Sequence, residues 1–243
     1  MNSIQQAADS ADGFLIFDLG GLYDEFLSAF LAHVGWIQQE ESLSLHQFNL
    51  WVSEPANFEK IRPKSERILP AEIATPLANK VLSNLPFNAS RDMFISDEEC
   101  LGFPNIYWRC VRGNSETDVW GLHADRWFWE IGESAIPKGW RRVKIWLPFQ
   151  QPKEEFGLWV VPGSHKGRYP YDVVAGSDGK RRPRLRDGVR RKSLVPAKVP
   201  VGCAVAFNDN LLHSGISASG LRLSMELTLV VNPSFSAGEE IYK

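Results

Sequence analysis

The sequence predicts a mainly β protein, a double-stranded β-helix (jelly-roll barrel) flanked by N-terminal α-helices. Helical periodicity runs through the first third of the chain, whereas short strands separated by Gly, Pro and Asn turns follow from about residue 105. Strands that come as a group after the helices favour an antiparallel barrel over an alternating α/β fold.

The expected helices precede the barrel. Residues 21–38 carry apolar side chains at four-residue steps, which predicts an amphipathic helix whose apolar face needs a partner. Pro70 precedes AEIATPLANKVLSNL, a second segment with helical periodicity. These helices belong to the stretch 1–104, which we expect to be a mostly helical support for the barrel.

The expected barrel core covers residues 105–232 of a single domain, 1–243. A basic loop insertion is expected within this core at 176–192. The candidate strands are Ile106–Val111, Trp120–Asp125, Arg141–Phe149, Phe156–Val161, Ser193–Val199, Gly202–Phe207 and Leu221–Asn232.

Two of these strands, Arg141–Phe149 and Leu221–Asn232, alternate between an apolar face and a polar or aromatic face. The polar faces are expected in water, as in any half-buried antiparallel sheet. The alternative places them inside the barrel around a ligand, with helices covering the apolar outside. From these strands alone the first interpretation is favoured, because such sheets are common.

Composition is ordinary for a globular protein, with 44% hydrophobic and 23% charged residues. The chain shows no secretory signal and no apolar run of membrane-spanning length, so we expect a cytoplasmic protein without a membrane span. Its three cysteines, Cys100, Cys110 and Cys203, have spacings that fit neither a disulfide framework nor a zinc site. The oligomeric state is not predicted.

Basic residues are concentrated in the segment 176–192, although the net charge of the chain is -2. This patch on an acidic body indicates one contact with an anionic small molecule rather than binding of nucleic acid. The segment is either a mobile lid over the site or a solvated loop.

A metal site is indicated by His123-Ala124-Asp125, at the end of an apparent strand. Residues i and i+2 of a strand project from the same side, so both side chains could reach one ion. His213 follows the apolar strand GCAVAF and offers a third ligand. Two histidines and one carboxylate form the facial triad of non-haem iron(II) oxygenases. His33 and His46 are interpreted as hydrogen-bonded core or surface residues.

An anion site is indicated by Arg222 and Ser224, which share one face of the last strand. A guanidinium can bind a carboxylate through two parallel hydrogen bonds, and a hydroxyl two residues along can add a third. The distal carboxylate of 2-oxoglutarate requires such an arrangement.

These motifs resemble the phytanoyl-CoA dioxygenase-like family of iron(II)/2-oxoglutarate oxygenases. The resemblance covers roughly residues 105–232 and rests on H-x-D, VKIWLPF, GLWVVPGSHKG, AVAFNDNLLHSG and the following arginine. The turn P-G-S-H is its most specific short piece. Gln150 and Gln151 depart from the family, which often has paired acidic residues there.

The resemblance implies iron(II), 2-oxoglutarate and dioxygen as cofactors. It implies His123, Asp125 and His213 as catalytic iron ligands, and Arg222 as the 2-oxoglutarate anchor. Trp146 matches an aromatic position that lines the cosubstrate pocket. His165 is interpreted as structural or as a support for a ligand. Resembling enzymes that halogenate lack the carboxylate ligand, so hydroxylation is favoured here, with desaturation and ring closure open.

Substrate contacts are expected from Trp127 and Trp129, which directly follow the metal motif and either stack on a ring or seal the barrel rim. Lys144 and Arg142 could contact an anionic group. The expected substrate is small or anionic: a sugar acid, a phosphorylated or glycan metabolite, or a thioester. Two other functions stay open, a non-catalytic jelly-roll ligand-binding or sensor module and a cupin-type metalloenzyme independent of 2-oxoglutarate.

Overall fold

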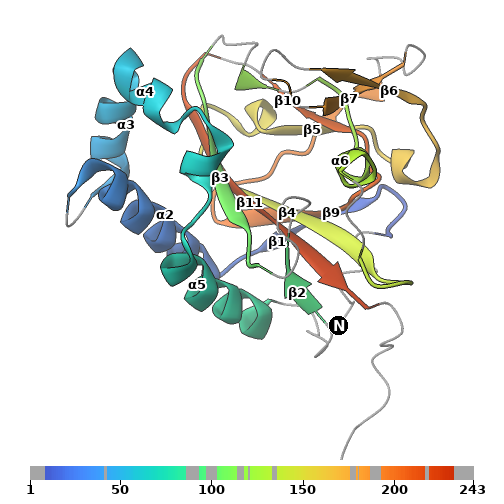
Figure 1. Cartoon of the computed structure of the whole chain (residues 1–243), viewed down its shortest axis with the longest axis horizontal. Helices are drawn as coiled ribbons and strands as arrows, with labels where there is room; N and C mark the ends of the chain where they lie inside the picture. Colours follow the sequence, from blue (N-terminus) through green and yellow to red (C-terminus); the bar gives the residue numbers. More distant parts are fainter. Residues whose placement is uncertain are drawn as a thin grey trace, which may run out of the picture.

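The computed structural model describes residues 9–40, 43–85, 93–96, 103–113, 118–119, 121–132, 136–175, 179, 181–186, 193–216 and 219–232. An antiparallel barrel lies on one side of the molecule, and a layer of helices lies on the other (Figure 1). No helix in these ranges is long and apolar enough to cross a membrane.

The helical layer contains both predicted helices and two shorter ones between them. Ser44 begins α3 with a capping box, in which its hydroxyl accepts from the backbone N–H of Gln47 while the Gln47 side chain accepts from the backbone N–H of Ser44. The layer consists of α2 (Leu22–Gln38), α3 (Leu45–Ser53), α4 (Pro55–Ile61) and α5 (Ala71–Asn84).

The larger sheet has the strand order β1-β9-β4-β11-β2, and β3 also pairs with β11. All of its pairings are antiparallel. β3 and β2 lie along the same side of β11, because they pair with different stretches of that strand. Its strands are β1 (Phe14–Asp18), β2 (Met93–Ile95), β3 (Ile106–Val111), β4 (Arg141–Gln150), β9 (Cys203–Asn208) and β11 (Arg222–Val231).

The smaller sheet has the order β10-β5-β8. It comprises β5 (Leu158–Val160), β8 (Val195–Pro196) and β10 (His213–Gly215). A separate hairpin joins β6 (Tyr171–Ala175) to β7 (Arg181–Leu185). Beside this hairpin lies α6 (Arg126–Ile131), the short helix that follows the metal motif (Figure 1).

Two apolar cores explain how the sequence forms these layers. The first joins the helices to the outward residues of the large sheet, such as Ile145 on β4 and Met225 on β11. The second lies between the two sheets and includes Trp146, Val160 and Phe207. Burial of both faces of the large sheet is therefore the main apolar contribution to the fold.

This arrangement contradicts the favoured expectation that the polar strand faces lie in water. Every residue of β11 is buried, including Arg222, Ser224, Glu226 and Thr228. The helices cover the apolar face, which leaves the barrel interior for the polar face. The alternative interpretation, polar faces turned inward, is confirmed.

Within the first 104 residues, β1 and β2 join the large sheet beside the helices. Two further expectations need correction. The segment 176–192 is not simply a loop, because its described part contains β7; residues 176–178, 180 and 187–192 lie outside the described residues. The predicted strand 193–199 shortens to β8, whose two residues pair with β5. The jelly-roll prediction itself is confirmed.

Candidate metal centre and pocket

His123 and His213 face each other across a β-bridge. The backbone N–H of His123 donates to the carbonyl of His213 over 3.0 Å, and the N–H of His213 donates to the carbonyl of His123 over 2.8 Å. This reciprocal pair fixes the two backbones side by side, with the imidazole centroids 4.4 Å apart. The smaller sheet thus brings together two histidines that are distant in sequence.

Asp125 reaches the same place by a different route from the one predicted. Residues 120–125 do not form a strand within the described part of the chain; only His123 makes a bridge, and Trp120 lies outside it. Asp125 already has helical backbone angles, φ -62° and ψ -32°, at the start of α6. The chain therefore turns after His123, and the turn directs the carboxylate toward the histidines.

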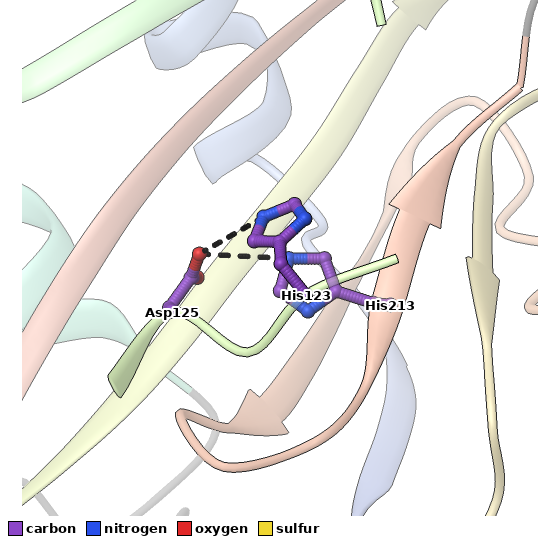
Figure 2. A group of neighbouring side chains, drawn as sticks. All are labelled: His123, Asp125 and His213. Atoms are coloured by element: carbon purple, nitrogen blue, oxygen red, sulfur yellow. Dashed lines mark ion pairs between the residues drawn. The ribbon is translucent and has the colours of Figure 1, made fainter. Parts of the chain in front are cut away.

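The three side chains meet closely enough to share one ion. Oδ1 of Asp125 lies 3.6 Å from Nε2 of His123 and 3.5 Å from Nε2 of His213 (Figure 2). One ligand atom from each residue lies within 4.8 Å of the other two, and Figure 2 shows both imidazoles on the same side of the carboxylate. We call this group the triad.

The outer nitrogens of both imidazoles contact backbone carbonyls. Nδ1 of His123 lies 2.7 Å from the carbonyl of Gly121, and Nδ1 of His213 lies 2.9 Å from that of Leu211. A carbonyl only accepts, so each Nδ1 carries the proton and each Nε2 keeps its lone pair for a metal. Burial and the neighbouring His213 lower the pKa of His123, which favours this neutral form.

The carboxylate of the triad is held ionised. Burial alone would raise the pKa of Asp125, but the neighbouring cation Lys144 opposes burial, and that pKa lies well below its ordinary value. Oδ2 of Asp125 is buried without a hydrogen-bond partner among the described residues. Two neutral imidazoles and one carboxylate are the donor set that suits non-haem iron(II), so the residues present fit this ion.

The triad opens into a pocket that Trp146 and Arg222 also line. About 460 Å³ of space there is free of atoms, part of it continuous with solvent. The indole of Trp146 packs against Gly157, where an added Cβ would lie 3.0 Å from the ring. Three groups predicted from the sequence, the triad, the aromatic residue and the anchor, thus share one cavity.

Arg222 is a buried cation without a carboxylate partner among the described residues. Its Nη1 donates to the carbonyls of Gly157, at 2.7 Å, and Phe156, at 3.3 Å. Its Nε and the hydroxyl of Ser224 are buried and lack hydrogen-bond partners within the described part of the chain. Burial lowers the pKa of Arg222 to about 10. A carboxylate ligand would neutralise this guanidinium and satisfy both groups.

Two further pocket residues, Arg109 and Glu226, were not assigned a role from the sequence. They form an ion pair across the ladder between β3 and β11. Burial alone would raise the pKa of Glu226, but Arg109 and Lys144 lower it to about 2. The alternating side-chain directions along Ile106–Val111 could have identified Arg109 as a pocket residue, since every second residue of that strand turns into the barrel.

The four predicted substrate contacts lie near the triad but do not line the pocket within the described part of the chain. Lys144 is buried between Asp125 and Glu226. Arg142 pairs with Asp209, and its guanidinium lies 4.5 Å from the ring centroid of Trp129. Trp127 stacks on Tyr171 of β6, with centroids 4.8 Å apart.

The remaining histidines have the roles expected of core or surface residues. Nδ1 of His33 accepts a hydrogen bond from the indole of Trp108 at 3.1 Å, and His46 is exposed. The ring of His165 lies against Gly13, and its backbone carbonyl accepts from Asn210. His165 does not belong to the metal-binding group of the described residues.

Among solved structures, EvdO2 from Micromonospora carbonacea var. aurantiaca complexed with 2-oxoglutarate aligns with a TM-score of 0.51 and 15% identity. The alignment covers 99% of this chain and 95% of that chain. EctD from S. alaskensis with bound Fe aligns with a TM-score of 0.50 and 16% identity, over 95% of this chain and 77% of that chain. These likenesses show a shared fold.

Sequence comparison gives no match among curated proteins. The profile of the family described as phytanoyl-CoA dioxygenase (PhyH) matches residues 110–219, which include the whole triad and the P-G-S-H turn. The resemblance seen in the motifs is confirmed: residues 110–219 of this chain are similar to the phytanoyl-CoA dioxygenase family.

Proposed function

We propose that the protein is an iron(II)/2-oxoglutarate-dependent oxygenase that hydroxylates a small, anionic organic substrate. The observation that carries this proposal is the buried guanidinium of Arg222, which lines the pocket of the triad and lacks a carboxylate partner among the described residues. A cupin-type enzyme that does not use 2-oxoglutarate would give this charge no counter-ion, and burying an uncompensated charge is costly.

Different residues of the pocket have different proposed roles in binding iron and 2-oxoglutarate. His123, Asp125 and His213 would hold the iron, which together with 2-oxoglutarate supplies an oxidant for unreactive C–H bonds. Arg222 and Ser224 would bind the distal carboxylate of 2-oxoglutarate, and Trp146 would form the wall beside it. The apolar second core, with Phe207 among its residues, forms an apolar part of the pocket wall.

The charges around the pocket support an anionic substrate. The cations Arg109, Lys144 and Arg222 exceed the anions Asp125 and Glu226 by one. Iron(II) and the dianion of 2-oxoglutarate cancel each other. A surplus of one positive charge around the pocket favours a substrate with one negative charge.

Anaerobic addition of iron(II) and then 2-oxoglutarate tests the cofactors. We expect a visible metal-to-ligand charge-transfer band, which Asp125→Ala should abolish because the triad loses its carboxylate. Asp172→Ala, which removes an exposed carboxylate on β6, is the matched control and should keep the band. A folded protein that shows no band would contradict the proposal.

The substrate class is tested by succinate formation. Candidate sugar acids, phosphorylated metabolites and thioesters are screened, and each active carboxylic acid is compared with its own amide. We expect the acid to stimulate succinate formation and its amide to stimulate it at least about tenfold less, the equivalent of 1.4 kcal/mol. Equal stimulation by both would show that the surplus charge does not select the substrate.

A further inference from the structure

We infer that Lys144 is a positioning residue, which holds the carboxylate of Asp125 in the orientation that presents Oδ1 to the two histidines. The inference rests on the proposed function, because it assigns the triad to a metal. It also gives Lys144 a role other than the substrate contact expected from the sequence.

The contacts of Lys144 are the first argument. Its side chain comes from β4, is only 5% exposed, and places Nζ 3.9 Å from Oδ2 of Asp125. That oxygen has no hydrogen-bond partner among the described residues, whereas Oδ1 lies near both imidazoles. Lys144 is therefore on the side of the carboxylate that faces away from the histidines.

The second argument is that Lys144 is itself held from several sides. Nζ lies 3.6 Å from Oε2 of Glu226, and it donates to the hydroxyl of Tyr107 at 3.3 Å and to that of Thr228 at 3.5 Å. Glu226 in turn pairs with Arg109. A buried ammonium with this many partners has little freedom to move toward a ligand in the pocket.

Local backbone structure gives a reason for such a support. Asp125 stands at the start of α6 and outside any strand, so sheet pairing does not fix its side chain. The two histidines are fixed by their bridge and by their carbonyl contacts. The carboxylate is therefore the triad member whose orientation depends most on a neighbouring side chain.

Charge repulsion and the positioning role predict opposite effects of removing Lys144 on metal affinity, so one measurement distinguishes them. A cation beside a metal site repels the metal, so its removal should tighten binding if charge alone matters. If Lys144 positions Asp125, its removal should weaken binding, because supports of metal ligands contribute about tenfold to a hundredfold in affinity.

The experiment is an anaerobic titration with cobalt(II) as a redox-stable probe, followed by tryptophan fluorescence and by the visible spectrum of the bound ion. We expect Lys144→Met to weaken cobalt(II) binding by about tenfold or more and to change the visible spectrum. Lys80→Met removes an exposed lysine paired with Glu25 on the helical layer, and it should change neither readout.

A second variant, Lys144→Gln, guards against a folding defect, since it keeps a hydrogen-bond donor at this position. We expect its affinity to lie between those of the wild type and Lys144→Met. Equal or tighter cobalt(II) binding by a folded Lys144→Met or Lys144→Gln protein would overturn the inference. Absence of cobalt(II) and iron(II) binding by the wild type would instead overturn the proposed function, which keeps the two failures distinguishable.

Discussion

Nε of Arg142 donates a hydrogen bond to Oδ2 of Asp209 over 2.7 Å, and both side chains are nearly buried, at 11% and 13% exposed. The backbone carbonyl of Asp209 accepts from the N–H of Arg126, the residue after Asp125. Asp209 therefore connects the loop before His213 both to β4, through its side chain, and to the helix that begins beside the metal motif, through its backbone.

The first prediction concerns the stability of this pair. Arg142→Met should lower the free energy of unfolding by about 3–5 kcal/mol, because it leaves the buried carboxylate of Asp209 without its cation. Arg141→Met is a matched control on the neighbouring residue, since the Arg141–Asp9 pair is exposed at 51% and 36% and should contribute at most about 1 kcal/mol. Urea denaturation of both variants measures the difference; equal losses would contradict the assignment.

The second prediction separates the two arginines of the pocket. Arg222→Gln should weaken 2-oxoglutarate binding by about tenfold to a hundredfold, the equivalent of the 1.5–3 kcal/mol of a charge-assisted hydrogen bond. Arg109→Gln should bind 2-oxoglutarate like the wild type, because Arg109 is already paired with Glu226. Titration of the charge-transfer band measures both affinities.

The same Arg222→Gln protein should be at least as stable as the wild type without ligands. Arg222 has no carboxylate partner in the described structure, so its removal relieves a buried charge. Thermal unfolding with and without 2-oxoglutarate is the measurement. A large loss of stability in the ligand-free variant would show that the carbonyl contacts of Arg222 matter more than its charge.

The third prediction is a pH dependence from His33. Burial lowers its pKa to about 4, from an ordinary value of 6.5. Between these values the unfolded chain binds a proton that the folded chain does not, so stability falls as the pH falls from 6.5 to about 4. The pKa difference sets an upper limit of about 3 kcal/mol on this loss.

His33→Gln keeps an acceptor for the indole of Trp108 but does not titrate. Its stability should fall less than that of the wild type over this pH window, measured by urea denaturation at several pH values. The lowered pKa values of His123 and His165 act in both proteins and cancel in the comparison. Parallel curves for the two proteins would rule out His33 as a source of the slope.

The fourth prediction concerns attachment of the β6–β7 hairpin. Trp127 stacks on Tyr171 at an interplanar angle of 20°, and the hydroxyl of Tyr171 donates to Glu130 of α6. Trp127→Ala should release the hairpin and speed trypsin cleavage within β7, at Arg181 or Arg184, by about tenfold or more. Trp36→Ala, at a tryptophan that is 57% exposed, is the control and should leave cleavage unchanged.

The long periodic elements could be predicted from the sequence, because burial of an apolar face repeats along them. The helix predicted at 21–38 is α2, and the strand predicted at 141–149 is β4 with one more residue. Short strands could not be predicted in this way. β1 and β10 have too few residues for periodicity, and pairing with β9 and β5 defines them.

The triad was predictable because three residue types and their order in the chain identified it. The geometry of the triad was not predictable, because the turn that directs Asp125 leads into α6. The aromatic sequence of this helix, RWFWEI, did not indicate where a helix begins. Glu226 and Arg109 were missed for a related reason. A charged residue on a strand face usually lies in water, and only the closure of the barrel turns this face inward.

β1 has a consequence beyond its place in the sheet. It forms the outer strand beside β9, and the sequence of β9, CAVAFN, contains no charge or proline that would discourage pairing with another chain. A shortened chain that begins after residue 19 would keep the triad and Arg222, yet it would leave the backbone groups of β9 open to any other extended strand. Because β1 is itself the present edge strand, trimming the chain to its metal-site motifs would move the edge of the sheet to β9, an apolar strand that promotes self-association.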